Sequence, residues 1–270
     1  MEDLSRCAIH TITLKSWDLR TACEKFSSVG VKGIGVWRQW LEGRPLAESR
    51  KILDDNGMTA VSLVRGGFFV GETTGQRNAA VEENKRCLDE AAALGASQVV
   101  LVCGAQPGIP LEQARTQITN GIESCVAHAD TLGVTLAIEP LHPMYADSKS
   151  AVNTVGQAND IIDRVGENRV GIAVDVYHTW WDPDLTKEIQ RAGKRIEGFH
   201  VCDWLTPTQD LLNDRGLMGE GCIDITGIRN AVEATGFSGW NEVEIFSDRL
   251  WASDPDEYLE SITRAYLEHV

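Results

Sequence analysis

Four side chains that can bind a metal ion stand at the ends of short apolar runs in the C-terminal half of the chain. They are Glu139, Asp175, His200 and Glu244. The runs that carry them cover residues 135–140, 170–178, 196–203 and 241–246. Three carboxylates and one imidazole form a donor set that suits Mn²⁺, Mg²⁺, Co²⁺ or Zn²⁺.

A helix-like segment separates each of these runs from the next, so we interpret the runs as parallel strands. The C-termini of all strands in a parallel barrel lie on one face, where the four side chains can converge. Taken singly, each acid could be a surface residue or a helix cap, and the histidine could be a hydrogen-bonded core residue. Their recurrence in successive strand–helix units favours one metal site.

The rest of the chain repeats the same alternation of strands and helices. Further strands are expected at residues 7–12, 33–37, 59–64 and 97–103. Helices are expected at residues 18–28, 45–56, 75–94, 111–132, 150–165, 184–192, 226–235 and 255–268. This pattern predicts an α/β protein with one (β/α)₈ TIM barrel over residues 1–270. A doubly wound sheet is the main competitor, but no Gly-x-Gly-x-x-Gly motif follows the first strand.

Composition and charge narrow the class of protein. The 270 residues carry a net charge of -15, which argues against a nucleic acid partner because phosphates would be repelled. The seven cysteines form no Cys-x-x-Cys pair, and we expect buried thiols in a reducing compartment. The acidic start Met1-Glu-Asp-Leu predicts no signal peptide, and no apolar run is long enough for a membrane span. We therefore expect a cytoplasmic protein with no membrane partner.

The segments around the four candidate ligands resemble the xylose isomerase-like TIM-barrel superfamily. The resemblance rests on Glu139-Pro, Asp175-Val-Tyr-His178, Phe199-His200 and Glu244-Ile-Phe. The superfamily includes sugar isomerases, ketose 3-epimerases, inosose dehydratases and endonuclease IV-type enzymes. In the epimerases the glutamates that match Glu139 and Glu244 bind the metal and also move the proton. The resemblance thus implies catalytic as well as metal-binding roles for both, and Mn²⁺ is the ion we expect first.

Three further residues are candidates for catalysis or substrate binding. His178 has the spacing from Asp175 at which the epimerases contact their substrate, although it could instead only hydrogen-bond Asp175. Arg215 resembles an arginine that binds substrate oxygens, but its distance from His200 along the chain is longer than in typical epimerases. His142 follows Glu139 closely and could be a base or a solvated loop histidine.

Aromatic residues are frequent near the expected catalytic face. Trp180 and Trp181 directly follow the expected strand of Asp175, and they could form a substrate wall or a subunit contact. The segment 65–71 holds glycines and phenylalanines and could be a substrate wall or a plain turn. The eight tryptophans look exposed as a set, so we expect a homo-oligomer or a complex with another subunit.

A metal ion held in this way can polarise a carbonyl and stabilise the enediolate formed by proton abstraction. We therefore predict a divalent-metal-dependent isomerase or epimerase of a ketose or related polyol. The alternative is a metal-dependent lyase or dehydratase on a keto-sugar or cyclitol, including β-elimination of 3-keto-glycosides or C-glycosides. Both reactions begin with the same proton transfer, so the ligand set does not separate them.

Two other classes of function are less favoured. A sugar-binding barrel without turnover would be expected to lose one of the four ligands, and all four are present. An abasic-site endonuclease would carry additional histidine ligands, and the acidic charge of the chain also opposes that role. The expected partner is a small-molecule carbohydrate substrate.

Overall fold

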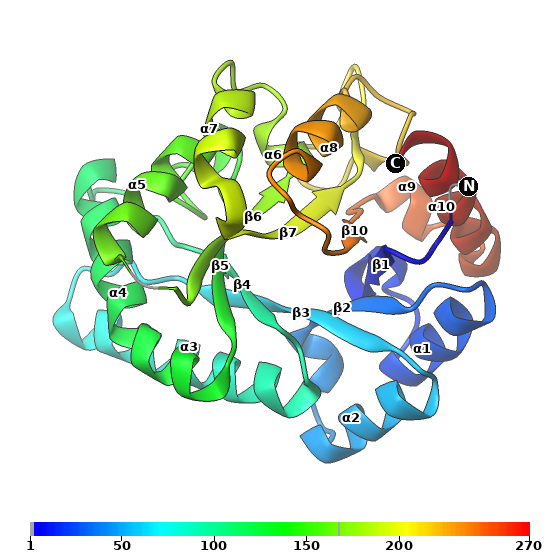
Figure 1. Cartoon of the computed structure of the whole chain (residues 1–270), viewed down its shortest axis with the longest axis horizontal. Coiled ribbons are helices and arrows are strands. Elements are labelled where there is room, and N and C mark those ends of the chain that lie inside the picture. The colour runs from blue at the N-terminus through cyan, green and yellow to red at the C-terminus, as the bar shows by residue number, and fades with distance from the viewer. Residues whose placement is uncertain (1–2, 167) are drawn as a thin grey trace.

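The computed structural model describes residues 3–166 and 168–270, and it contains a closed parallel barrel surrounded by helices (Figure 1). The barrel strands follow one another in the order β1-β10-β7-β6-β5-β4-β3-β2. Parallel pairing of β1 with β10 closes the ring between the two ends of the chain. The predicted single TIM barrel is therefore confirmed.

The strands and helices alternate along the chain. The barrel strands are β1 (Cys7–His10), β2 (Gly33–Trp37), β3 (Thr59–Gly67), β4 (Gln98–Val102), β5 (Thr135–Ile138), β6 (Val170–Asp175), β7 (Ile196–Val201) and β10 (Asn241–Val243). The α-helices are α1 (Leu19–Ser28), α2 (Leu46–Asp55), α3 (Thr74–Leu94), α4 (Leu111–Leu132), α5 (Val155–Val165), α6 (Val176–Thr179), α7 (Leu185–Ala192), α8 (Ile225–Glu233), α9 (Asp248–Trp251) and α10 (Pro255–His269). Short 3₁₀ helices cover Thr11–Leu14, Arg38–Leu41, Pro143–Tyr145 and Gly193–Arg195.

One small sheet lies outside the barrel. Its strands β8 (Asp203–Trp204) and β9 (Arg215–Gly216) pair antiparallel, with Trp204 opposite Arg215. The segment 205–214 between them is the part of the chain that lengthens the path from His200 to Arg215. The pairing brings the two ends of this segment together, so Arg215 lies next to the end of β7 even though it is distant in sequence.

The helix boundaries follow capping groups that the sequence carries. Helix α4 spans residues 111–132 as predicted, and Gly133 ends it with a φ of 70°. The predicted helix 150–165 was wrong at its start, because Thr154 caps α5 by accepting a hydrogen bond from the Gln157 N–H at 3.1 Å. The first, sixth and last strands also end earlier than predicted, at the face where the chain leaves the barrel.

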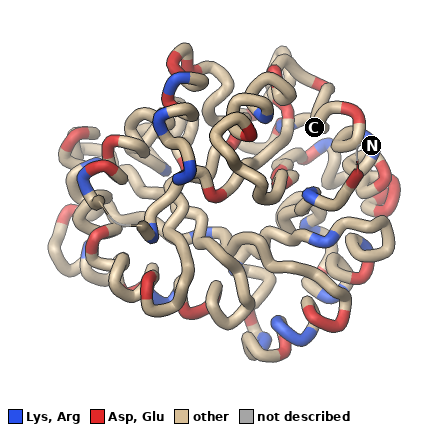
Figure 2. The backbone as a smooth tube through the Cα atoms, in the orientation of Figure 1, with Lys and Arg blue, Asp and Glu red and all other residues tan. Residues whose placement is uncertain are grey.

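Apolar packing fills the space between the strands and the outer helices. Charged residues lie mainly on the helices and loops of this outer layer (Figure 2). A separate cluster inside the barrel consists of buried side chains from five successive strands and from the 3₁₀ helix after β1: Trp37, Val64, Val100, Ala137, Ala173 and Ile12. Inward-pointing residues of a barrel pack in layers, and this apolar layer supports the polar groups of the site.

The tryptophans do not form the exposed set that the sequence suggested. Trp37 is buried, and the other seven are all partly buried. The large hydrophobic side chains that are exposed among the described residues are instead Phe68, Leu111 and Leu211. The reason given for self-association was therefore wrong, and the association itself stays a prediction.

Two other expectations concern the cysteines and the membrane. Six of the seven cysteines are buried free thiols, as predicted, whereas Cys222 is exposed. No helix in the described part of the chain is long and apolar enough to cross a membrane. Residues 1–2, on which the signal-peptide expectation partly rested, lie outside the described residues.

Gly67 at the end of β3 provides a test of the strand geometry at the catalytic face. Its φ is 104°, and a Cβ atom there would lie 2.0 Å from the Val102 carbonyl oxygen of β4. Gly67→Ala should therefore lower the free energy of unfolding by about 3 kcal/mol or more, from backbone strain and overpacking together. Urea denaturation measures this change.

The matched control is Gly108→Ala, because Gly108 has a similar φ of 89° and open space around it. This variant should lose only the strain of the backbone conformation, about 1 kcal/mol. Equal losses in the two variants would contradict the close approach of β3 to β4.

Candidate metal centre

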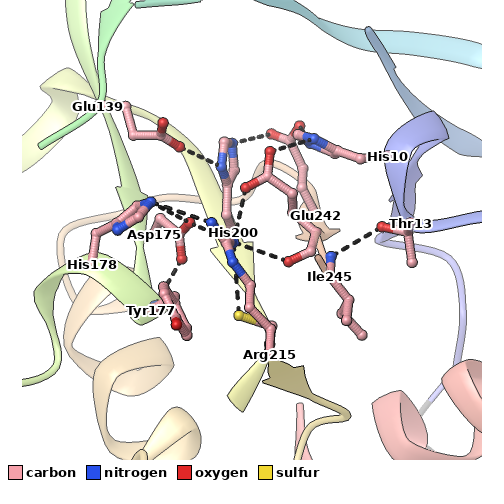
Figure 3. Close-up of polar contacts among 12 residues, drawn as sticks. His10, Thr13, Glu139, Asp175, Tyr177, His178, His200, Arg215, Glu242 and Ile245 are labelled. Carbon is pink, nitrogen blue, oxygen red and sulfur yellow. Dashed lines mark hydrogen bonds and ion pairs between the residues drawn. The ribbon is translucent and has the colours of Figure 1, made fainter. Parts of the chain in front are cut away.

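The barrel brings the four predicted metal ligands together. Asp175 is the last residue of β6 and His200 lies in β7, while Glu139 and Glu244 directly follow β5 and β10. These four strands are neighbours in the barrel, and Asp175 is the register partner of His200. One donor atom from each side chain lies within 4.8 Å of the others (Figure 3).

Several donor atoms in this cluster have no hydrogen-bond partner in the protein. They are Glu139 Oε1 and both ring nitrogens of His200, and all are buried. Glu139 Oε1 and His200 Nδ1 lie 3.0 Å apart, an ion-pair contact that lacks hydrogen-bond geometry. Buried polar atoms normally form hydrogen bonds, so metal-binding atoms that converge on one point without them fit a bound cation. The set of three carboxylates and one imidazole fits a divalent ion.

The electrostatics of the cluster point the same way. Burial raises the pKa of Asp175 to about 7. The positive charge of Arg215 opposes this increase, and the negative charges of Glu244 and Glu139 add to it. Burial lowers the pKa of His200, but the surrounding carboxylates of Glu242, Glu139 and Glu244 outweigh burial and raise it to about 10. Negative charge is thus in excess around these donors, and a divalent cation would relieve the repulsion.

Arg215 lies in the site despite its distance along the chain from His200. Its Nη1 donates to Asp175 Oδ2 at 3.1 Å and to Glu244 Oε2 at 3.0 Å (Figure 3). The guanidinium also lies 4.4 Å from the centroid of the Tyr177 ring. The backbone N–H of Arg215 donates to the Phe246 carbonyl at 2.9 Å, which ties β9 to the segment that carries Glu244. Arg215 therefore orients two ligands and partly neutralises them.

His178 contacts both Arg215 and a ligand. It lies in α6, and Asp175 caps the N-terminus of this helix. The cap is a 2.7 Å hydrogen bond that the Tyr177 N–H donates to Asp175 Oδ1. His178 Nε2 lies 3.3 Å from Arg215 Nη2 and 3.6 Å from Asp175 Oδ2. Burial and the charge of Arg215 hold the pKa of His178 well below its usual value. The imidazole is therefore neutral, and its Nδ1 has no hydrogen-bond partner in the protein.

A cavity of about 270 Å³ opens beside the ligand cluster. Its size suits a small ligand, because pockets for drug-sized molecules are about 300–1,000 Å³. Both catalytic candidates Glu139 and Glu244 line it, together with His178 and Arg215. The remaining walls are Ile12, Trp37, Gln39, Val64, Arg65, Val102, Leu141, Tyr145, Lys149, Leu212 and Phe246.

Two predicted residues, His142 and Trp180, belong neither to the ligand cluster nor to the lining of this cavity. The His142 ring stacks on Trp204 with 5.2 Å between centroids, and its Nδ1 accepts a hydrogen bond from the Met144 N–H at 3.2 Å. Trp180 packs against the same Trp204 at 5.6 Å. Both side chains thus belong to an aromatic cluster beside the site, and the structure does not bring them together with the metal ligands.

Sequence reasoning missed a pair of buried charged residues next to the ligands. His10 Nε2 lies 2.9 Å from Glu242 Oε2, and His10 Nδ1 lies 3.0 Å from Glu244 Oε1. Glu242 also accepts a hydrogen bond from the Ser62 hydroxyl at 2.7 Å. The signal was present, because Glu242 and Glu244 are two residues apart and His10 ends the first strand. Side chains two residues apart on a strand point to the same side.

His10 and Glu242 form a layer of polar contacts behind the ligands. His10 holds one oxygen of Glu244, whose other oxygen is held by Arg215. Glu242 Oε1 lies 3.8 Å from Nε2 of His200, whereas His200 Nδ1 faces Glu139. A carboxylate behind a metal-binding histidine fixes the ring and raises its basicity.

Comparison with known proteins identifies the family. Residues 23–267 match the family described as xylose isomerase-like TIM barrel, so the chain belongs to it. A solved protein of Sinorhizobium meliloti 1021, SMc04130, is 43% identical with a TM-score of 0.95 over 99% of both chains. The inosose isomerase of Bacillus velezensis is 24% identical over 94% of this chain and 93% of its own length.

Two more distant comparisons concern fold and class. A structure of IOLI protein with a bound zinc atom is 22% identical, with a TM-score of 0.86 over 98% of both chains, and shows the same fold. The 3-dehydroshikimate dehydratase of Pseudomonas aeruginosa is 24% identical over 97% of this chain but only 43% of its own length. The named relatives are isomerases, an epimerase and a dehydratase, so the predicted class of enzyme is confirmed.

The four ligands can be tested by removing them one at a time. Glu139→Ala and Asp175→Ala should each lose the divalent ion during dialysis, because three remaining donors leave the coordination incomplete. Elemental analysis of the dialysed protein measures the ion per chain. His128→Ala is the control, since His128 is partly exposed, pairs with Asp89 at 2.8 Å and lies outside the cluster. Retention of the ion by both ligand variants would contradict the site.

Glu242→Gln tests the layer behind the ligands. The amide keeps the shape of the side chain but removes the charge beside His200, so the affinity for the ion should fall about 10–100-fold. Titration against a chelating dye measures the affinity. Glu197→Gln is the matched control, because Glu197 lies in the same strand as His200 and lines the same cavity as Glu242, but its carboxylate forms no ion pair with the ligands in the described part of the chain. Equal affinities of the two variants would show that Glu242 does not support the metal ligand.

Proposed function

We propose that this member of the family is a divalent-metal-dependent isomerase or epimerase of a ketose or related polyol. The observation that carries the proposal is the pair Glu139 and Glu244, which belong to the ligand cluster and also line the cavity. The similarity to the inosose isomerase of Bacillus velezensis supports a carbohydrate-like substrate. Mn²⁺ is the proposed ion because hard carboxylate oxygens dominate the donor set.

The two glutamates approach the cavity from different strands. Glu139 follows β5 and Glu244 follows β10, and the two strands β6 and β7 lie between them in the barrel. A bound ion would act as a Lewis acid on a substrate carbonyl. A small substrate in the cavity would then meet a carboxylate on either side, one to take the proton and one to return it.

The neighbouring residues prepare these carboxylates for proton transfer. Both oxygens of Glu244 are held, one by His10 and the other by Arg215, and these contacts keep its pKa well below the usual range despite burial. Glu244 is therefore ionised and fixed in position. The Nε2 of the neutral His178 accepts from Arg215, which can only donate, so its Nδ1–H, without a protein partner, can donate a hydrogen bond to a substrate hydroxyl.

The second candidate function is a metal-dependent lyase or dehydratase, which needs an acid near the leaving group. His142 lies outside the cavity, so it is poorly placed for this role. Lys149 lines the cavity, and burial together with Arg65 and Arg215 lowers its pKa, which makes it a better proton donor. The similarity to the 3-dehydroshikimate dehydratase supports this alternative.

Association and location of the protein stay predictions. We retain the homo-oligomer or complex with another subunit, for which the exposed side chains of Phe68, Leu111 and Leu211 are the available apolar contacts. We also retain a cytoplasmic location, in line with the free thiols of the cysteines.

Solvent exchange tests the proposed reaction. In deuterated water the product should carry deuterium at the carbon next to the carbonyl, because the proton passes through a carboxylate. Glu244→Gln should slow this exchange about a hundredfold or more, since the amide cannot accept a proton. Proton NMR of candidate ketoses measures the exchange, and elemental analysis confirms that the variant still holds the ion.

Glu197→Gln is the control, because this partly buried carboxyl group lies in β7 outside the lining of the ligand cavity. It should exchange at the rate of the unaltered protein. Exchange at that same rate in a metal-loaded Glu244→Gln variant would exclude Glu244 as the base and leave Glu139. If no ketose or cyclitol that binds is exchanged or converted, the proposed function is wrong.

A further inference from the structure

Two cations at the ligand cavity have no carboxylate partner. Arg65 and Lys149 both line the cavity beside the metal ligands. Within the described part of the chain, neither side chain forms an ion pair within 4.0 Å, although Glu139 and Glu244 act on the charge of Arg65, and Asp210 on that of Lys149, from farther away. Arg65 is exposed and Lys149 is partly buried, so both side chains stay charged and lie open to a ligand in the cavity.

Aromatic rings hold these two cations in place. The Arg65 guanidinium lies 5.0 Å from the ring centroid of Phe68 and 5.8 Å from that of Trp37. Lys149 Nζ lies 4.2 Å from the ring centroid of Tyr145. Cation–π contacts fix the position of a charge but do not cancel it. The positive charge of both residues is therefore available to a ligand.

The backbone also fixes both residues. Arg65 lies at an irregularity of β3 between Val64 and Gly66, and these two neighbours pair with Val100 and Leu101 of β4. The Lys149 carbonyl accepts a hydrogen bond from the Gly104 N–H at 3.0 Å, and the Lys149 N–H donates to the Tyr145 carbonyl at 2.9 Å. The two charges thus come from separate, well-anchored segments that meet at one cavity.

The charge of the metal cluster is accounted for without these two residues. Its three ligand carboxylates would be balanced by a divalent ion and Arg215, which contacts Asp175 and Glu244. The additional acid Glu242 is paired with His10 at 2.9 Å. Arg65 and Lys149 remain as an excess of positive charge facing the ligand.

We propose that the substrate carries an anionic oxygen group, a carboxylate or a phosphate, which Arg65 and Lys149 bind. This inference rests on the proposed function, because it concerns the same cavity. The substrate would place its carbonyl at the ligand cluster and its anionic group between the two cations. Arginine matches planar oxyanions through paired N–H donors, and lysine adds a mobile point charge.

Binding of three matched probes to the manganese-loaded protein tests the proposal. D-glucitol, D-gluconate and D-glucitol 6-phosphate share a chain of six carbons and differ in the group at one end. At least one of the two anions should bind about tenfold more tightly than D-glucitol, since charge-assisted hydrogen bonds are about twice as strong as neutral ones. Isothermal titration calorimetry measures the dissociation constants, and the preferred anion distinguishes carboxylate from phosphate.

Substitution of the two cations shows whether the anionic group binds to Arg65 and Lys149 or to the metal ion. Arg65→Gln and Lys149→Gln should each remove most of the preference for the anion, while the affinity for D-glucitol changes less than twofold, the scatter of a surface substitution. Lys15→Gln is the matched control, because Lys15 Nζ also lies over an aromatic ring, 3.5 Å from the Trp251 centroid, but outside the cavity. This control should keep the full preference.

Two results would overturn the proposal. One is equal or absent binding of all three probes to protein that holds its ion. The other is a preference for the anion that survives both variants, because the anion would then bind the ion directly. Neither result depends on turnover, so the outcome is independent of the solvent-exchange test of the proposed function.

Discussion

The concentration of acidic side chains inside the barrel is the constraint on which the site depends. Glu139, Asp175, Glu242 and Glu244 are all at most 5% exposed, and they lie close together. Burying several carboxylates beside one another is costly unless cations or hydrogen bonds compensate them. The protein supplies Arg215 and two histidines, and the donor atoms left unpaired leave room for a divalent ion.

This compensation is arranged in two layers. Nearest the cavity, Arg215 holds Asp175 and Glu244, and it reaches them through the antiparallel pairing of β8 with β9. Behind them, His10 connects Glu242 with Glu244 across the pairing of β1 and β10, the contact that also closes the barrel. Closing the barrel and positioning the Glu244 carboxylate therefore depend on the same strands.

The fold and the four ligands could be predicted because both follow from local patterns. Apolar runs ending in a donor identify strands, and parallel strands place their ends together. Arg215 was assigned only by resemblance, since its place depends on a strand pair of four residues. His10 and Glu242 were missed because their partners lie 232 and 180 residues away in sequence. His142 looked suitable from its nearness to Glu139, but stacking on Trp204 places it outside the cavity.

The division between strands and loops explains why the class of reaction is easier to infer than the substrate. The ligands are fixed at strand ends, where register determines their distances. Arg65 also extends from a strand, but its neighbour Phe68 and the second cation Lys149 lie in connecting segments. The positions of these segments depend on contacts such as the hydrogen bond from the Gly104 N–H to the Lys149 carbonyl. Loops on a rigid scaffold commonly carry specificity. The two cations that we propose for an anionic substrate group therefore come from segments that are distant in the sequence.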